Sequence, residues 1–414
     1  MKEEILSHLN NPGYLEQLYR SNKTTFKTEF NIIYPELNDH TLASYWNERL
    51  NYETSEISWG SRSELAFVIF ASLIAGMIAK FPALFYWKPE LFYQRNIAFI
   101  VLPMLTTYFI WKRNLSSRKI IPAAIAILVS LLFINLLPID KKSDTLILSC
   151  IHLPLFLWAI LGFTYVGENA NDNSKRLDFL RYNGDLLIMT GLILIAGAIL
   201  TAVTLGLFSI IGRDIKEFYF DYVVIFGVAA APIVGTYITQ TNPQLVNKVS
   251  PVIAKIFSPL VLIMLVVYLV AIFLSGKDPY KDRDFLIVFN FLLIGVMAII
   301  LFSVAEAFKK NENRVSSYIL LALSIVTVVV NGIALSAILF RISEWGVSPN
   351  RLAVLGANIL MLTNLLMITF RLYKNMTKQG DISEVENSIS KFLPVYVVWI
   401  VIVTFVFPLV FSFQ

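Results

Sequence analysis

Very little cysteine, histidine and charge occurs in this sequence, and each shortage excludes a class of protein. Cys150 is the single cysteine in 414 residues, so an intrachain disulfide is impossible. The three histidines, His8, His40 and His152, are too scattered to predict a metal site. Charged residues make up 15% of the chain. Soluble domains have about 25%, so the composition argues against an ordinary soluble protein.

Motifs for soluble catalysis are also missing. There is no phosphate-binding glycine loop, no HExxH, no pair of CxxC sequences and no nucleophile elbow. An ATP-driven pump would need a nucleotide site that this sequence lacks, and we expect no cofactor and no metal. The net charge of +5 is typical of basic cytoplasmic loops in a membrane protein, so it does not predict nucleic-acid binding.

Long apolar runs are what the sequence has in abundance. Apolar residues make up 57% of it, and we count eleven runs close to the roughly 20 residues that a helix needs to cross a bilayer core. The runs cover approximately residues 65–87, 96–111, 119–138, 145–166, 185–212, 217–239, 254–275, 284–308, 315–340, 351–373 and 393–413. They predict an all-α fold, a polytopic transmembrane helical bundle over residues 63–414, with the lipid bilayer as its main partner.

Residues 1–62 differ in character, because they are polar and predict several short amphipathic helices. The clearest pattern puts four side chains on one helical face, namely Leu42, Tyr45, Trp46 and Leu50. No cleavable signal peptide is expected, since the first apolar run begins too far along the chain. This segment is either a small cap folded against the inner membrane face or a docking module for a cytoplasmic protein partner.

Loop charges predict the orientation. Basic residues are in modest excess on the side of the N-terminus, and basic residues favour the cytoplasmic side. We therefore predict a cytoplasmic N-terminus. An odd number of spans then leaves the C-terminus on the periplasmic side. The sequence does not indicate an oligomeric state.

The stretch "RISEWGVSPNR", residues 341–351, predicts a tight hairpin between two spans. Gly346 suits the left-handed conformation that ends helices. Ser348 is a candidate N-cap, and Pro349 suits the first position of the next helix. The first helix should therefore end near Trp345, with about three residues in the turn.

Two arginines and one glutamate flank this turn. Arg341 lies in the last turn of the first helix, and Glu344 is three residues further on, so the two are spaced to pair. Arg351 lies near the positive end of the next helix, where a cation costs roughly 0.3–1 kcal/mol. Glu344, an anionic ligand or a lipid headgroup is a candidate to offset this cost, and the alternative is a simply solvated arginine.

The hairpin sequence "RISEWGVSPNRLAVLGANILML" resembles a pattern of a bacterial family described as domain of unknown function 4153. In that pattern, R-I-x-x-aromatic-G-[LV]-[ST]-P-N-R precedes an apolar span. The early stretch "AKFPALFYWKPELFYQRNIAFIV" is similar to the first membrane segment of members from Bacteroidota. The resemblance implies a multi-span bacterial inner-membrane protein. It implies no activity and supplies no catalytic residues.

Ionisable and amide side chains inside the spans are the main functional signal, because such groups are costly in a bilayer and are often functional. On a rise of 1.5 Å per residue, six of them lie roughly 6–13 Å below the outer surface. The six are Lys80, His152, Asp221, Asn290, Asn331 and Asn358. They predict one outward-facing polar pocket with a Lys80–Asp221 charge pair. The alternative is that each group bonds a neighbouring helix separately and only fixes packing.

Three functions follow from these patterns. The first is a permease-like protein, in which Arg341 and Arg351 form an anion-attracting rim above the pocket. The second is a membrane sensor or assembly scaffold that binds its partner through residues 1–62. The third, an enzyme acting on a lipid-linked substrate, has the least support, because no acid–base pair or metal cluster stands out.

Overall fold

The fold is almost entirely helical. The computed structural model describes residues 2–37, 41–51, 60–138, 143–168, 172–210, 214–243, 258–267, 269–270, 280, 283–307, 314–377 and 383–413. About 90% of the structure is helix, and the described residues contain no strand. The all-α prediction is therefore confirmed. The chain divides into two compact units, Met1–Ile57 and Ser58–Gln414, and each is described by itself.

The first unit is a small helical domain with its own core. Its elements are α1 (Lys2–Ser7), α2 (Pro12–Ser21), α3 (Lys23–Ile33), the 3-10 helix η1 (Tyr34–Leu37) and α4 (Thr41–Asn51). Asn11 caps α2, because its side chain accepts a hydrogen bond from Tyr14 N at 3.1 Å. Leu15, Phe26 and Trp46 are among the buried apolar residues that hold the helices together.

One prediction for this unit is wrong. Trp46 and Leu50 are buried and Leu42 packs beside them, as expected, but Tyr45 is 67% exposed. The inward face of α4 instead includes Ala43, which lies three residues before Trp46. Tyr45 is rotated by about 100° from Trp46 on the helix and so points away from the core.

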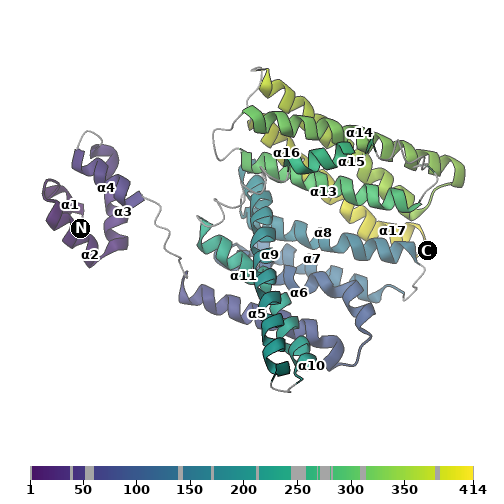
Figure 1. Cartoon of the computed structure of the whole chain (residues 1–414), viewed down its shortest axis with the longest axis horizontal. Helices are drawn as coiled ribbons and strands as arrows, with labels where there is room; N and C mark the ends of the chain where they lie inside the picture. The colour runs from purple at the N-terminus through teal and green to yellow at the C-terminus, as the bar shows by residue number, and fades with distance from the viewer. Residues whose placement is uncertain are drawn as a thin grey trace. The chain divides into compact units, whose positions relative to one another are not determined.

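The second unit contains all the apolar helices. They are α5 (Arg62–Leu84), α6 (Pro89–Lys112), α7 (Ser117–Leu136), α8 (Asp144–Val166), α9 (Asn173–Ile210), α10 (Lys216–Phe218), the π-helix η2 (Tyr219–Val224), α11 (Ile225–Thr241), α13 (Arg283–Ala307), α14 (Arg314–Trp345), α15 (Pro349–Met376), α16 (Ser383–Val401), the π-helix η3 (Ile402–Val406) and α17 (Phe407–Val410). Figure 1 shows α14, α15 and α16 running side by side.

Eight helical segments in the described residues are long and apolar enough to cross a membrane. The predicted run at 254–275 is represented there by the shorter apolar helix Ser258–Val267. The run at 284–308 coincides with α13, of which Leu292–Ala305 is counted as a shorter apolar helix. Helix α6 is not among the eight. Part of the first of these runs lies outside the described residues. The structure therefore supports a helical membrane protein and leaves the count of eleven as a prediction.

Two large apolar clusters, with smaller ones beside them, form the interior of this unit. One is built by α5, α6, α8, α9 and α11 and is rich in aromatic side chains, including Tyr108 and Phe109. The other is built mainly by α13, α14, α15 and α16. The first part of α9 joins them, because Phe179 packs in the first cluster and Leu177 in the second.

The rest of α9 has a different environment. None of the residues in its most apolar 18-residue window is buried within the structure. An apolar helix with so little protein contact is stable in lipid, which solvates its side chains on all sides. Apolar side chains that are not covered by protein are compatible with a helix that spans a membrane.

Candidate functional site

An ion pair joins two neighbouring helical segments near the end of α5. The Lys80 Nζ lies 3.2 Å from Oδ2 of Asp221 in η2. The same Nζ lies 4.4 Å from the centre of the Tyr222 ring, which is a cation–π distance. The exposed fraction of the side chain is 7% for Lys80 and 54% for Asp221. The ammonium group is therefore buried, whereas the carboxylate lies at the surface of the protein.

The backbone around this pair is irregular and tightly packed. Asp221 lies in the π-helix η2, and π-helical turns are frequent at functional sites. One turn before Lys80, a Cβ added to Gly76 would lie only 2.2 Å from Cδ1 of Phe226 in α11. The missing side chain of Gly76 thus lets α5 and α11 approach closely, which holds the two charged groups within reach of each other.

The other four predicted pocket residues lie on different helices. His152 in α8 is partly buried, and its Nδ1 lies 2.8 Å from the backbone oxygen of Leu148 in its own helix. Asn290 lies on α13, Asn331 on α14 and Asn358 on α15, and these three helices pack against one another. The structure therefore brings together the charged pair and groups the asparagines in another part of the bundle. One pocket that contains all six residues stays a prediction.

The hairpin between α14 and α15 has the predicted form. Helix α14 ends at Trp345 and α15 begins at Pro349. Gly346 has a φ of 75°, the left-handed conformation expected after a helix end. Ser348 is the N-cap of α15. These local signals are strong enough that the sequence alone gives the helix ends correctly.

Arg351 has partners that the sequence does not predict. Its Nη1 donates hydrogen bonds to the backbone oxygens of Trp345 at 2.8 Å and Gly346 at 2.7 Å. These carbonyls form the negative end of the α14 dipole. The unfavourable position of Arg351 at the start of its own helix is therefore offset by the end of the preceding one.

Arg341 turns inward rather than toward Glu344. Its Nε donates to the backbone oxygen of Tyr280 at 3.0 Å, and its guanidinium carbon lies 5.4 Å from the centre of the Trp345 ring. Glu344 is exposed, and it forms no ion pair within the described parts of the chain. The Arg341–Glu344 pair that the spacing predicts is therefore not formed, because the Arg341 guanidinium donates to the Tyr280 carbonyl instead. The anion-attracting role of Arg341 and Arg351 stays a prediction.

A third arginine, missed in the sequence, caps another helix. Arg95 is buried, and its guanidinium donates to the backbone oxygens of Asn135, Leu137 and Pro138 at the end of α7. Beside it, the amides of Asn96 and Asn135 exchange two hydrogen bonds of 3.0 and 2.8 Å. These contacts join α6 to α7, and within the described part of the chain none of them involves an acidic side chain.

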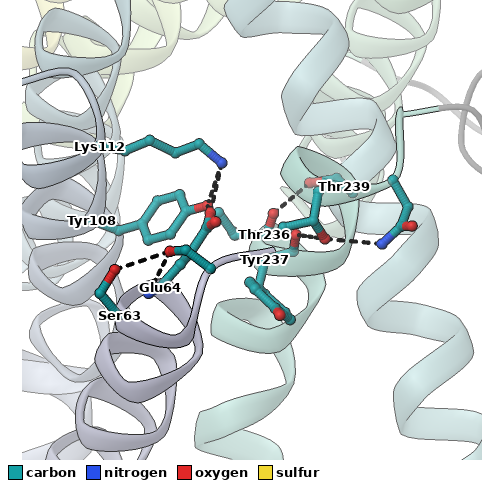
Figure 2. A network of polar contacts seen from close by, with 10 residues as sticks. Ser63, Glu64, Tyr108, Lys112, Thr236, Tyr237 and Thr239 are labelled. Atoms are coloured by element: carbon teal, nitrogen blue, oxygen red, sulfur yellow. Dashed lines mark hydrogen bonds and ion pairs between the residues drawn. The ribbon is translucent and has the colours of Figure 1, made fainter. Parts of the chain in front are cut away.

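A second charged cluster, also missed, lies at the other end of α5 (Figure 2). Oε1 of Glu64 accepts hydrogen bonds from the Tyr108 hydroxyl and from the Lys112 Nζ, both at 2.6 Å. The Lys112 Nζ also donates to the Tyr108 hydroxyl at 3.0 Å. Glu64 is buried, so this triad fixes the start of α5 against the end of α6.

The end of α11 lies next to this triad (Figure 2). A Cβ added to Gly60 would lie 2.8 Å from Oε2 of Glu64 and 2.9 Å from Cγ2 of Thr241 in α11. The hydroxyl group of Thr236, also on α11, lies 2.8 Å from the hydroxyl group of Tyr182 on α9, and this contact links the two helices. Polar side chains from four helices thus gather at this end of the bundle.

The sequence held one signal for the Glu64 cluster. Ser61 and Glu64 stand three residues apart just before an apolar run, as in a capping box, and the Ser61 hydroxyl does accept from Glu64 N at 3.1 Å. That signal places a helix start but not the partners on α6. Among the described residues, no group of three or more His, Cys, Asp or Glu side chains is placed to hold a metal ion.

The C-terminal helices carry buried polar atoms that have no hydrogen-bond partner. Among the described residues, seven such atoms belong to uncharged side chains of α14, α15, α16 and η3: Asn331 Nδ2 and Oδ1, Asn358 Nδ2 and Oδ1, Asn364 Oδ1, Trp399 Nε1 and Thr404 Oγ1. Each would cost about 1–3 kcal/mol if it stayed unsatisfied. The sum, roughly 7–20 kcal/mol, rivals the 5–15 kcal/mol by which a whole domain is typically stable.

Comparisons with known proteins give no further identification. No family model matches the chain, and neither the curated proteins nor the solved structures searched include a match. The resemblance of the hairpin to the domain of unknown function 4153 pattern therefore stays a prediction.

Proposed function

We propose that this chain is a permease-like protein of the bacterial inner membrane, in which the Lys80–Asp221 pair forms part of an outward-facing solute site. In this proposal the chain crosses the membrane eleven times, with a cytoplasmic N-terminus and a periplasmic C-terminus. The resemblance to the domain of unknown function 4153 family is part of the same proposal.

The observation that carries the proposal is the asymmetry of the charge pair. Placing lysine or aspartate in a membrane span costs about 2.5–3.5 kcal/mol each on insertion scales, so such residues are usually functional. Lys80 is buried while Asp221 is accessible, so an incoming cation or proton reaches the carboxylate first. A cation or proton bound to the Asp221 carboxylate would compete with the Lys80 ammonium for it and so change the contact between α5 and η2. Breaking of this ion pair by a bound solute would couple solute binding to a movement of α5 relative to η2, as transport requires.

Complementation of a deletion strain tests this function. The strain is profiled for growth, metabolites and envelope composition and then supplied with the wild-type chain, Lys80→Met, Asp221→Asn, or the exchanged pair Lys80→Asp with Asp221→Lys. We expect each single variant to fail and the exchanged pair to recover part of the phenotype. Lys88→Met and Asp214→Asn change exposed charges near the same helix ends and serve as matched controls.

Expression and monodispersity of each variant are measured in parallel, because a misfolded variant would also fail to complement. Single variants that fold and complement as well as the wild type would contradict the proposal.

A second function, a scaffold that binds a cytoplasmic protein, is supported by the separate N-terminal unit. This unit has its own buried core, and it also exposes apolar side chains such as Ile32 and Tyr45. Deletion of residues 2–51 distinguishes the two functions. If the chain without residues 2–51 fails to complement the deletion strain while Lys80→Met complements it fully, the scaffold function is favoured.

A further inference from the structure

We propose that the interior of α14, α15, α16 and η3 binds small neutral molecules that both donate and accept hydrogen bonds, with Asn331 and Asn364 as contacts at one level and Asn358 as a contact about 9 Å nearer the turn. These molecules are water or a neutral solute of similar chemistry, such as a short polyol or an amide. This inference is independent of the Lys80–Asp221 pair.

The three asparagines are fully buried polar groups of these helices. Each is 0% exposed, and five of their six amide atoms have no hydrogen-bond partner among the residues that the structure describes. The sixth, Nδ2 of Asn364, donates to the Tyr396 hydroxyl at 3.1 Å. Buried amides in native proteins are almost always hydrogen-bonded, and a bound water or ligand is the usual partner where protein atoms supply none.

The hairpin brings two of them to the same level. Asn331 lies fourteen residues before Trp345, about 21 Å along α14, and Asn364 lies fifteen residues after Pro349, about 22 Å along α15. Helices α14 and α15 are antiparallel neighbours joined by a short turn, so equal distances from the turn mean equal depth. Asn358 lies six residues before Asn364, about 9 Å nearer the turn.

The mixture of unpartnered atoms indicates a neutral ligand. Nδ2 of Asn331 and Asn358 and Nε1 of Trp399 are donors, whereas the three amide Oδ1 atoms are acceptors. A bare cation would satisfy the oxygens and leave the donors unpaired, and an anion would do the reverse. Water, a polyol or an amide satisfies both kinds of atom, and the contributing side chains carry no charge.

Met361 is a built-in reporter for this site. It lies three residues after Asn358 and three before Asn364, so it shares their region of α15. Its exposed fraction is 6%, and that of Met297 on α13 is 5%, so Met297 is a control of the same type and burial. Hydroxyl radicals formed from a bound water would oxidise Met361 although bulk solvent barely reaches it.

X-ray hydroxyl-radical footprinting of the full-length protein in detergent, read by mass spectrometry, tests the proposal. Native mass spectrometry of the same sample looks for a retained organic ligand. If the ligand is water, we expect Met361 to be oxidised roughly threefold or more above Met297, and Asn331→Leu or Asn358→Leu to remove most of the excess. If it is a neutral solute, we expect an added mass that is lost in Asn358→Leu.

Thermal unfolding of the same variants gives a second readout. Loss of a bound ligand lowers the melting temperature of Asn358→Leu, whereas removal of two truly unpaired amide atoms from a dry core raises it. The proposal is overturned if Met361 is oxidised no more than Met297, no added mass is found, and Asn358→Leu unfolds at a higher temperature than the wild type. Since the wild-type footprint needs no variant, a variant that fails to fold does not prevent this outcome.

Discussion

Arg95 and Arg351 both donate to carbonyl groups at the C-terminal end of a helix that precedes or follows their own. The last carbonyls of a helix lack intrahelical partners and carry partial negative charge. A guanidinium group, with five donors, satisfies several of these groups at once, which matters most where the helix end is buried, as it is beside Arg95. Cationic side chains in this bundle therefore close helix ends as well as pairing with acids.

We therefore expect Arg351 to stabilise the hairpin through the two hydrogen bonds that its Nη1 donates to backbone carbonyls. Arg351→Lys keeps the charge but cannot reproduce the two bonds from Nη1, so we expect a loss of about 1–2 kcal/mol, with Arg351→Ala losing somewhat more. Thermal unfolding in detergent measures this. Glu344→Gln, at an exposed position of the same hairpin, should leave the melting temperature unchanged. Equal stability of Arg351→Lys and wild type would refute the capping role.

The Glu64 cluster makes a prediction of the same kind. Tyr108→Phe removes one donor to the buried carboxylate and should cost about 1–2 kcal/mol, while Glu64→Ala leaves Lys112 without its anion and should cost more. Because the Lys112 side chain is 30% exposed, water partly solvates it, and we expect the Glu64→Ala loss to stay near 3 kcal/mol. Chemical unfolding monitored by fluorescence compares the two variants. A Glu64→Ala protein as stable as the wild type would mean that the triad is not a stabilising contact.

At the scale of helices, the contact between α5 and α11 depends on one missing side chain. Gly76→Ala places a methyl group within 2.2 to 2.6 Å of three atoms of the Phe226 ring, including Cγ, so the ring cannot simply swing away. We expect Gly76→Ala to destabilise the protein by about 1–3 kcal/mol. Gly191→Ala on α9 is the matched control, because nothing lies within 4 Å of its added Cβ. Similar melting temperatures for the two variants would show that α5 and α11 are not tightly packed.

The sequence predicted those elements whose signals are local. The hairpin ends were predictable because Gly346, Ser348 and Pro349 each have a strong conformational preference. The Lys80–Asp221 pair was predictable because a charge within an apolar run has few partners at its own depth. The Glu64–Lys112 contact was not, since charges at span ends are as easily solvated as paired. Arg351 was misjudged because its partners are backbone carbonyls, which no side-chain pattern reveals.

At the scale of the whole molecule, the N-terminal unit should respond to acid separately from the membrane unit. The hydrogen bond from the Arg20 side chain, supported by Arg49, holds the pKa of Glu16 below its ordinary value of 4.5. A lowered folded-state pKa means that this contribution is complete above pH 4.5 and is lost as the pH falls through the lower value. The contribution stays within about 1 kcal/mol because the pair is partly solvated.

Hydrogen–deuterium exchange of α2 and α4 peptides, corrected for the intrinsic rate at each pH, measures this effect. We expect the wild-type unit to open more readily below pH 4.5, and Glu16→Gln to show a flatter response with lower protection at neutral pH. An unchanged pH response in Glu16→Gln would exclude Glu16 as the source.

The proposed function depends on the Lys80–Asp221 pair lying in a water-accessible site that faces outward. The single cysteine makes this directly measurable, because Cys150→Ala gives a background without thiols. In that background, Asp221→Cys should react with a membrane-impermeant maleimide added to intact spheroplasts. Ser63→Cys, at the opposite end of α5, should react only after the membrane is opened. An Asp221→Cys protein that stays unlabelled, or is labelled only from the cytoplasmic side, would contradict the proposed site.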